Sequence, residues 1–434
     1  MRCVPFLSTL CLALCLTSVD LAAQSSAFAL VAVRDPFAPS GRASRVLRVD
    51  LQLGTSLDLG RFTSDGLPVE AIAWDPVARA IVLALREPTS TRLVRLEWNG
   101  SAITGERAIS RLLDPVTSLS VAWRGDLYLT TARGIYRTPR NGGSVFPVLA
   151  QRAASALVAE FGASYALLAN GREIASGTEP GFCWVDLQNG TITSGPFSFP
   201  GFAGNTITGI ADLPTGAPRE VLSDELGNAL LSTGFQDPTP IPGVPSRGPG
   251  SSVALRAENA FEMLVLGGSA RPYLDSFVAF GQPAPSWTQR AGPFLGDPID
   301  FCLVPAAQAE ALAFGESCGP GFASLDAPLA PLLGTPNFEL RASGFAAQIP
   351  LIFALGLSEQ SFAGLALPVE IFPGCFLAAS GEVLLLTSTD VRGDASLFFA
   401  LPSAPWLAGR SAYAQTLQLV PPERFSNALA LHLR

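Results

Sequence analysis

The chain has 434 residues, of which 48% are hydrophobic and only 15% charged, and its formal net charge is −8. All 28 basic residues are arginines scattered along the chain, so no basic stripe marks a nucleic-acid surface. The absence of lysine also excludes Schiff-base chemistry and a P-loop lysine. With 41 Gly and 36 Pro to supply turns, this apolar composition predicts an all-β protein of two or three domains rather than a disordered chain.

The first 23 residues have the pattern of a secretory signal peptide. They contain one arginine, an apolar stretch from Val4 to Leu16 that is too short to span a membrane, and then small residues. We expect cleavage after Ala23, with Ala27-Phe28-Ala29 as a later alternative. No later apolar run approaches ~20 residues, so we expect a mature chain without a membrane span that is secreted or held at the cell surface.

Four of the seven cysteines follow the signal peptide: Cys183, Cys302, Cys318 and Cys375. Export permits disulfides, and four cysteines allow three connectivities. No pair is spaced as Cys-x-x-Cys and the chain has one histidine, so a zinc cluster is not predicted.

Similar apolar segments recur after the signal peptide at the spacing of propeller blades. The segments VEAIAW, SLSVAW, SALVAE, ITGIAD, SVALRA and IDFCLV begin near residues 69, 118, 155, 207, 252 and 299, at intervals of 49, 37, 52, 45 and 47 residues. Each interval fits one four-stranded sheet rather than a helical hairpin. The spacing predicts a β-propeller over residues 24–306.

Three of these units carry Asn-Gly at the turn between their outer strands, at Asn99-Gly100, Asn141-Gly142 and Asn189-Gly190. Asn-Gly accepts a positive φ at both central positions of a tight hairpin. We therefore expect tight hairpins with that backbone conformation at the three positions.

The two ends of the repeat array predict one shared blade. Residues 27–33, 45–51 and 56–62 have the pattern of three strands, and the strand that contains Phe301 has no blade of its own. Together they would complete a sixth blade and pair the open edges. Seven blades remain the alternative if the Pro-rich stretch Gln236–Gly250 hides a degenerate blade. A stack of β-sandwiches is the other topology that the strand pattern allows.

One unit contains Gly125-Asp126-Leu127-Tyr128 and Gly134-Ile135-Tyr136-Arg137, followed by Gly142-Gly143. In these residues it resembles the blades of six-bladed propellers of the NHL and YWTD families. The resemblance covers one blade of six, so it implies a fold and no ligand class.

The last third of the chain has a different strand pattern. We expect a linker over residues 307–314 and a small β-sandwich over residues 315–434, because seven or eight strands fit into that length. The expected strands span residues 338–343, 351–358, 366–372, 375–380 with 383–388, 395–402, 412–420 and 428–434.

This C-terminal segment contains a series of short motifs: Gly315-Glu316-Ser317-Cys318, Gly334-Thr335-Pro336, Leu355-Gly356-Leu357-Ser358, Leu367-Pro368, Pro373-Gly374-Cys375, Asp390 with Gly393, Leu407-Ala408-Gly409 and Tyr413-Ala414-Gln415. In these motifs it resembles a module that recurs in predicted exported bacterial proteins, often behind propellers or other repeats. The family has no known activity. The resemblance implies export, a sandwich fold and a surface or sorting role, although Gly319-Pro320 stands where many relatives have a proline directly after the first cysteine.

We expect Cys318 and Cys375 to form a disulfide because both lie in this module. Closing their 57-residue separation would contribute about 4 kcal/mol on the loop-entropy model. Cys183 and Cys302 belong to blades on opposite sides of a six-blade ring, so we expect them to be buried and unpaired. His432, the only histidine, alternates with leucines, and we expect it to be a strand residue of the sandwich rather than a catalytic base.

A ligand of the propeller would bind at a mouth of the central channel, which the connections between blades surround. The charged candidates there carry no cofactor or metal pattern, and they are Asp65, Glu70, Arg111, Asp114, Arg152, Arg247 and Asp297. The sequence therefore favours a monomeric, non-enzymatic binding protein or scaffold for a protein or glycan partner. The alternatives are a propeller hydrolase or lyase that acts on a polysaccharide or lactone through channel-mouth carboxylates, and a purely structural envelope component.

Overall fold

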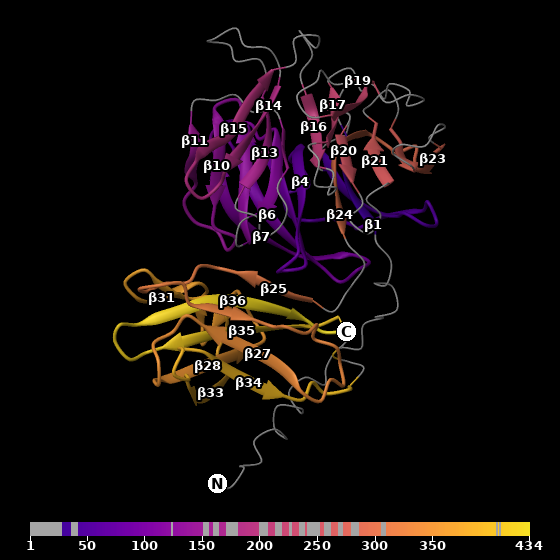
Figure 1. The fold of residues 1–434 in the computed structure, drawn as a ribbon. Helices are drawn as coiled ribbons and strands as arrows, with labels where there is room; N and C mark the ends of the chain where they lie inside the picture. The colour runs from indigo at the N-terminus through magenta and orange to yellow at the C-terminus, as the bar shows by residue number, and fades with distance from the viewer. Residues whose placement is uncertain are drawn as a thin grey trace.

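The computed structural model describes residues 28–35, 42–122, 125–150, 156–158, 165–170, 181–198, 207–212, 219–224, 228–233, 239–240, 252–255, 262–267, 272–278, 286–304, 310–404, 407 and 409–434. The regular structure of these residues is antiparallel β-sheet, as the composition predicts, and a group of four-stranded sheets lies above a second β-domain (Figure 1). No helix among the described residues is long and apolar enough to cross a membrane.

The described residues of the first domain form six four-stranded sheets, each with one inner strand and three strands that follow outward. The first two are β4 (Val69–Asp75), β5 (Ala80–Arg86), β6 (Thr91–Trp98) and β7 (Ile103–Leu112), and β8 (Ser118–Ala122), β9 (Asp126–Thr131), β10 (Gly134–Thr138) and β11 (Phe146–Ala150). The next two are β12 (Ala156–Val158), β13 (Tyr165–Asn170), β14 (Gly181–Asp186) and β15 (Thr191–Ser198), and β16 (Ile207–Asp212), β17 (Arg219–Asp224), β18 (Ala229–Thr233) and β19 (Thr239–Pro240). The last two are β20 (Ser252–Leu255), β21 (Glu262–Leu266), β22 (Leu274–Val278) and β23 (Ser286–Ala291), and β24 (Asp297–Val304), β1 (Phe28–Arg34), β2 (Ser44–Asp50) and β3 (Ser56–Asp58).

The inner strands of these sheets form a closed ring. β24 contacts β4, and the contacts continue through β8, β12, β16 and β20 back to β24. A closed ring of radially repeated four-stranded sheets is a β-propeller. The inner strands are the six segments that the repeat spacing predicts. The alternative of seven blades depends on the Pro-rich stretch Gln236–Gly250, of which only residues 239–240 are described, so the number of blades stays a prediction.

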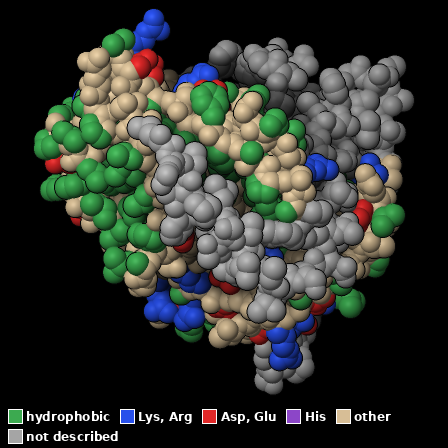
Figure 2. All heavy atoms as spheres, turned by 90° about the horizontal axis from the view of Figure 1, so that it is seen from below, with side chains coloured by type: hydrophobic (Ala, Val, Ile, Leu, Met, Phe, Trp, Pro, Cys, Tyr) green, Lys and Arg blue, Asp and Glu red, His purple; other side chains and the backbone are tan. Residues whose placement is uncertain are grey.

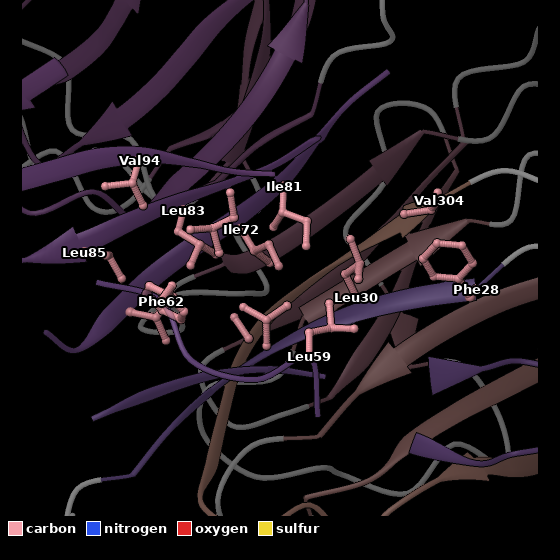
Figure 3. Close-up of a cluster of buried hydrophobic side chains, with 14 residues drawn as sticks. Phe28, Leu30, Leu59, Phe62, Ile72, Ile81, Leu83, Leu85, Val94 and Val304 are labelled. Carbon is pink, nitrogen blue, oxygen red and sulfur yellow. The ribbon is translucent and has the colours of Figure 1, made fainter. Parts of the chain in front are cut away.

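One sheet of the ring joins the two ends of the propeller sequence. β1 pairs with β24 with Val31 opposite Phe301, as the sequence predicts. Strand β1 is buried on both faces because Leu30 packs in a cluster with β4 and β5, while Val31 packs in a cluster with β21 and β22. Figure 3 shows the first of these clusters, in which Leu30 and Val304 of the closing sheet lie beside side chains of β4, β5 and β6. Closure therefore buries apolar side chains toward both neighbouring sheets.

The Asn-Gly turns lie where they were expected, between the third and fourth strands of three sheets, but their predicted backbone conformation is wrong. Only the glycines have positive φ, 95° at Gly100, 99° at Gly142 and 65° at Gly190. In the first turn the Asn99 side chain accepts hydrogen bonds from the backbone N–H groups of residues 101 and 102. This capping favours a longer loop with one left-handed glycine over a two-residue turn.

The second domain is a sandwich of two sheets. Its five-stranded sheet contains, in order, β25 (Glu310–Phe314), β36 (Arg424–His432), β35 (Ser411–Gln418), β28 (Pro350–Gly356) and β33 (Val383–Ser388). Its three-stranded sheet contains β26 (Ser324–Asp326), β27 (Phe338–Ser343) and β34 (Ala395–Phe399). Side chains from both sheets form the core between them, among them Leu340, Phe353 and Leu429. Two short hairpins complete the domain, β29 (Ser361–Phe362) with β30 (Leu365–Ala366), and β31 (Val369–Phe372) with β32 (Cys375–Leu377).

The structure corrects the expected linker over residues 307–314. Glu310–Phe314 is strand β25 and pairs with β36 at the edge of the sandwich sheet. The alanine-rich composition of the segment obscured its strand character, which depends on the pairing with β36 and on the burial of Phe314. The other domain boundaries stay predictions.

The predicted disulfide between Cys318 and Cys375 is confirmed, with the two Cα atoms 5.2 Å apart. It joins a residue that bridges to Phe425 of β36 with the hairpin strand β32. Cys183 is buried on β14, as expected, whereas Cys302 on β24 is half-buried and not disulfide-bonded. Burial raises the pKa of the Cys302 thiol well above its ordinary value, which disfavours a nucleophilic thiolate.

We predict that replacing Cys318 and Cys375 together with alanine lowers the free energy of unfolding of the sandwich by about 4 kcal/mol, because the unfolded chain then regains the entropy of a 57-residue loop. Denaturant unfolding with and without a reductant measures the effect. The reductant should destabilise the wild type and leave the double variant unchanged. Equal effects on both proteins would contradict a stabilising disulfide.

Candidate functional site

The propeller has two faces because consecutive antiparallel strands are joined at alternate ends of a sheet. We call the side with residues 76–79 and 139–145 the sandwich face, since these connections contact the second domain. We call the side with residues 87–90, 113–117 and 132–133 the loop face. The domains are stacked accordingly, with the sandwich lying against one side of the propeller (Figure 1).

Small side chains on the sandwich sheet let the propeller approach closely. On β36, Ala428 and Ala430 alternate with Leu429 and Leu431, and the leucines point into the sandwich core. The alanines pack instead with Val77 of the β4–β5 turn. The side chains of β36 therefore point alternately into the sandwich core and toward the propeller. We call the side of the sheet that points toward the propeller the docking face.

The same docking face ends at the exposed edge of the sheet. Ala428 on β36 pairs with Gln415 on β35, and Gln415 pairs in turn with Ala354 on β28. Ala354 then pairs with Leu384 on the edge strand β33. Ala428 and Ala354 are buried, but Leu384 is exposed. Hydrophobic side chains gather on part of the surface seen from below (Figure 2). The propeller thus covers the β36 side of this sheet face, whereas Ala354 is covered by the sandwich's own β31–β32 hairpin and Leu384 on β33 stays exposed.

His432 lies on the docking face and joins the two domains. Its Nε2 is 2.8 Å from the carbonyl oxygen of Pro76, and its Nδ1 is 2.7 Å from the Ser411 hydroxyl. A neutral imidazole that donates from Nε2 and accepts at Nδ1 satisfies both partners. Burial, and then the positive charge of Arg79, lower the pKa of His432 to about 4, so the ring is neutral at pH 7. This agrees with the prediction of a strand histidine.

A buried network of four charged side chains crosses the same interface. Arg95 Nη2 is 2.9 Å from Asp75 Oδ2, and Arg140 lies 3.7 Å from the same oxygen. Arg140 then pairs with Glu359 of the sandwich, and its guanidinium lies 4.9 Å from the centre of the Phe314 ring. All four are at most 5% exposed. Two positive and two negative groups therefore compensate each other away from water.

Burial and the neighbouring charges shift the pKa values of the two arginines in opposite directions. Burial lowers the pKa of Arg95, while the charges of Asp75 and Glu359 outweigh burial and raise the pKa of Arg140. Neighbouring hydrogen bonds run from Asn141 to the Glu359 carbonyl at 3.1 Å and from Arg107 to Gln360 at 3.3 Å. A displaced sandwich would leave buried charges unpaired, so the network favours one docking geometry.

The loop face brings two of the predicted site residues together. The Thr91 hydroxyl lies 2.8 Å from Glu70 Oε2 and 3.0 Å from the Asp114 carbonyl oxygen. Glu70 also accepts a hydrogen bond from the Val116 N–H at 3.0 Å. Arg86 lies 3.9 Å from Glu70, and Arg133 lies 3.4 Å from Asp114. Glu70, near the start of β4, and Asp114, in the β7–β8 connection, are therefore both held by neighbouring strands at the loop face.

Arg111 belongs to a neighbouring cluster around Glu87. Glu87 accepts hydrogen bonds from Arg111 at 2.9 Å, from Arg92 at 2.8 Å and from Ser90. The Ser90 hydrogen bond, followed by those from the two arginines, lowers the pKa of Glu87. Because β7 is the outer strand of its sheet, Arg111 lies at the rim of the loop face and not at the mouth of the central channel, where it was expected.

The remaining predicted site residues do not join these clusters. Asp65 lies 3.5 Å from Arg42, and its carbonyl accepts the N–H groups of residues 43 and 44. Asp297 is the first residue of β24 and lies opposite Arg34 of β1. Arg152 and Arg247 lie outside the described residues.

Glu87, Arg92 and Arg133 were not among the predicted site residues, which were sought only at the connections between blades. The β5–β6 and β9–β10 hairpins end at the same face as those connections. Glu87 follows directly on the apolar strand β5, a position that could have identified it. Arg95 offered another clue, because a charged residue inside an apolar strand needs a buried partner.

The described carboxylates of the loop face share one feature, a pairing with arginine. Each of the carboxylates Glu70, Glu87 and Asp114 has an arginine beside it. Across the described ranges, no group of three or more His, Cys, Asp and Glu side chains is placed to hold a metal ion.

Comparison with known proteins assigns no family. No family model and no curated protein matches the chain. The solved structures to which it is similar include Kuenenia stuttgartiensis hydrazine synthase, 9% identical over 54% of this chain and 70% of that one with a TM-score of 0.39. They also include the Neurospora crassa Pan2 WD40 domain (12% identical, 51% and 68% covered, TM-score 0.31) and a proposed 6-phosphogluconolactonase of Bacteroides fragilis (12%, 65% and 99%, TM-score 0.40). None of these TM-scores reaches 0.5. The propeller rests on its ring of sheets, and the resemblance of residues 315–434 to an exported module stays a prediction.

We predict that Arg140→Met lowers the free energy of unfolding by ~3–5 kcal/mol, because it leaves the buried Glu359 carboxylate without its arginine. Replacing Glu359 with glutamine as well should recover much of the loss. Arg341→Gln is the matched control, since Arg341 is half-exposed on β27 and pairs with Glu339 at the surface. It should cost less than ~1 kcal/mol. Equal losses for Arg140→Met and Arg341→Gln in denaturant unfolding would refute the buried network.

We predict that His432 makes the protein less stable in acid. Its pKa is about 4 in the folded protein and ~6.5 in the unfolded chain, so between these values the unfolded state binds more protons. The contribution of the neutral ring is fully present above pH ~6.5 and falls toward pH ~4, by at most on the order of 3 kcal/mol.

The comparison must be made with His432→Gln, because burial raises the pKa of Asp126 to about 6 and so acts in the opposite direction. Urea unfolding at several pH values from 7.5 to ~4.5 should show the wild type losing stability relative to the variant. Parallel pH profiles for the two proteins would mean that the imidazole is not held neutral.

Proposed function

We propose that the protein is an exported, non-enzymatic β-propeller scaffold that binds a macromolecular partner at its loop face. The C-terminal sandwich serves surface association or sorting, and it also covers the first two sheets at the opposite face of the propeller. The observation that carries the proposal is the division of roles between the two faces. The sandwich face is occupied by a buried interface, whereas the loop face carries exposed side chains on connections that vary in length.

Export is proposed from the first 23 residues, whose pattern is that of a signal peptide. The Cys318–Cys375 disulfide supports it, because such bonds persist in oxidising compartments. A role without catalysis is proposed because arginines neutralise the loop-face carboxylates Glu70, Glu87 and Asp114, an arrangement suited to holding a surface shape.

We predict that the full chain made in a bacterial host is recovered outside the cytoplasm with Gln24 as its first residue, and that deletion of residues 1–23 keeps it inside. Cell fractionation and mass determination of the mature chain measure both results. A full-length chain that stays in the cytoplasm with Met1 intact would overturn export.

Binding is tested on the same mature protein with arrayed proteins and glycans. Hydrogen exchange should then show protection by the partner at residues 86–92 and 111–118, with residues 76–79 unchanged. Turnover of a polysaccharide or lactone substrate by the pure protein would replace the scaffold with the hydrolase alternative. Protection confined to the sandwich domain would contradict the proposed face.

A further inference from the structure

The arginines of the loop face are more exposed to solvent than the carboxylates that pair with them. The Arg133 side chain is 74% exposed and its partner Asp114 is 21% exposed, while Arg111 is 58% exposed and Glu87 is 12% exposed. Arg86 and Arg92 are likewise more exposed than Glu70 and Glu87. We call these four arginines, Arg86, Arg92, Arg111 and Arg133, the arginine rim.

We propose that the arginine rim, together with Leu113, docks an acidic segment of a protein partner. The inference rests on the proposed function, since it names the partner class for the same face.

The arginine rim has the charge that an acidic segment requires. The rim has four guanidinium groups against three carboxylates, and Glu87 is shared by two of the arginines. A guanidinium carries five N–H donors, and the pair with Glu87 uses Nε and Nη2 of Arg111. Further donors therefore point outward from a side chain that Glu87 already holds in place. Preorganised arginines of this kind suit carboxylates, which they can bind with two parallel hydrogen bonds.

The arginine rim is a positive surface on a protein with a negative net charge. The formal net charge of the protein is −8, so an acidic partner is repelled by the molecule as a whole. A local excess of exposed guanidinium groups on such a protein fixes where the partner can approach.

Leu113 favours a protein segment over an acidic glycan. It lies in the β7–β8 connection between Arg111 and Asp114, and it is 80% exposed. The exposed aromatic side chains of the described residues lie elsewhere, with Phe146 at the sandwich face and Phe322, Phe376 and Phe398 in the sandwich domain. The described part of the loop face thus offers an aliphatic contact beside arginines and no aromatic platform for a sugar ring.

The test uses the mature full chain and a short fluorescein-labelled peptide of Asp, Glu and Leu, with a second peptide in which Asn and Gln replace the acids. Fluorescence anisotropy should show saturable binding of the acidic peptide only. Raising the salt to ~1 M, where the Debye length is ~3 Å, should abolish it. The double variant Arg111→Gln/Arg133→Gln should weaken binding roughly tenfold, and Leu113→Ser should weaken it as well.

Arg341→Gln on the sandwich is the control and should bind as the wild type does. Circular dichroism of each variant establishes that it is folded. Unchanged affinity of the folded double variant would overturn the arginine rim as the docking site, and so would equal binding of the acidic and neutral peptides.

Two further measurements, binding of an acidic oligosaccharide and hydrogen exchange with uncharged partners, distinguish failure of this inference from failure of the proposed function. If an oligosaccharide of uronic acids binds and the peptide does not, with the same loss in the double variant, the partner class is wrong while the loop face stands. If the neutral peptide or an uncharged partner protects residues 111–118 in hydrogen exchange, the rim proposal fails and the scaffold proposal survives. If no partner of any class protects the loop face, both fail.

Discussion

The pairing of β1 with β24 is the constraint on which the rest of the structure depends. It joins residues from opposite ends of the propeller sequence, with Val31 beside Phe301, and it leaves neither end of the array as an open edge. It also sets a direction, because β24 begins at Asp297 on the loop face and ends at Val304 on the sandwich face. The chain must therefore leave the propeller on the side where β25 begins the sandwich. The position of the second domain follows from the topology of the first.

The contacts at the interface then favour one orientation of the sandwich on the propeller. The contact between Val77 and the alanines of β36 is apolar and non-directional, and such a contact alone would tolerate sliding. The pairs from Asp75 through Arg95 and Arg140 to Glu359 have strict geometry and no water to replace a lost partner. We infer that burial supplies most of the attraction and that the ion pairs select the arrangement.

The sequence predicts what depends on local alternation, and it fails where side chains meet across long separations. The inner strands, the closing pair at Phe301 and the bond between Cys318 and Cys375 follow from strand periodicity and from domain membership. Arg140 and Glu359 are 219 residues apart, and no local pattern connects them. Strand β25 was taken for a linker because its five residues become a strand only beside β36. The turn at Asn99 was mistaken because the side chain of asparagine caps the loop instead of adopting a positive φ.

Pairs of arginine and carboxylate side chains have different roles at the two faces of the propeller. At the sandwich face, Arg140 and Glu359 are both buried, so a change in either leaves a charge without solvent and the pair acts on stability. At the loop face, Glu87 is held inside while Arg111 remains exposed, so the pair contributes little to stability and leaves the arginine accessible. The two pairs contain the same chemical groups and differ in their exposure to solvent. An arginine fixed by an inner carboxylate has already lost much of its conformational freedom, so a second carboxylate that approaches from outside binds at a lower entropic cost.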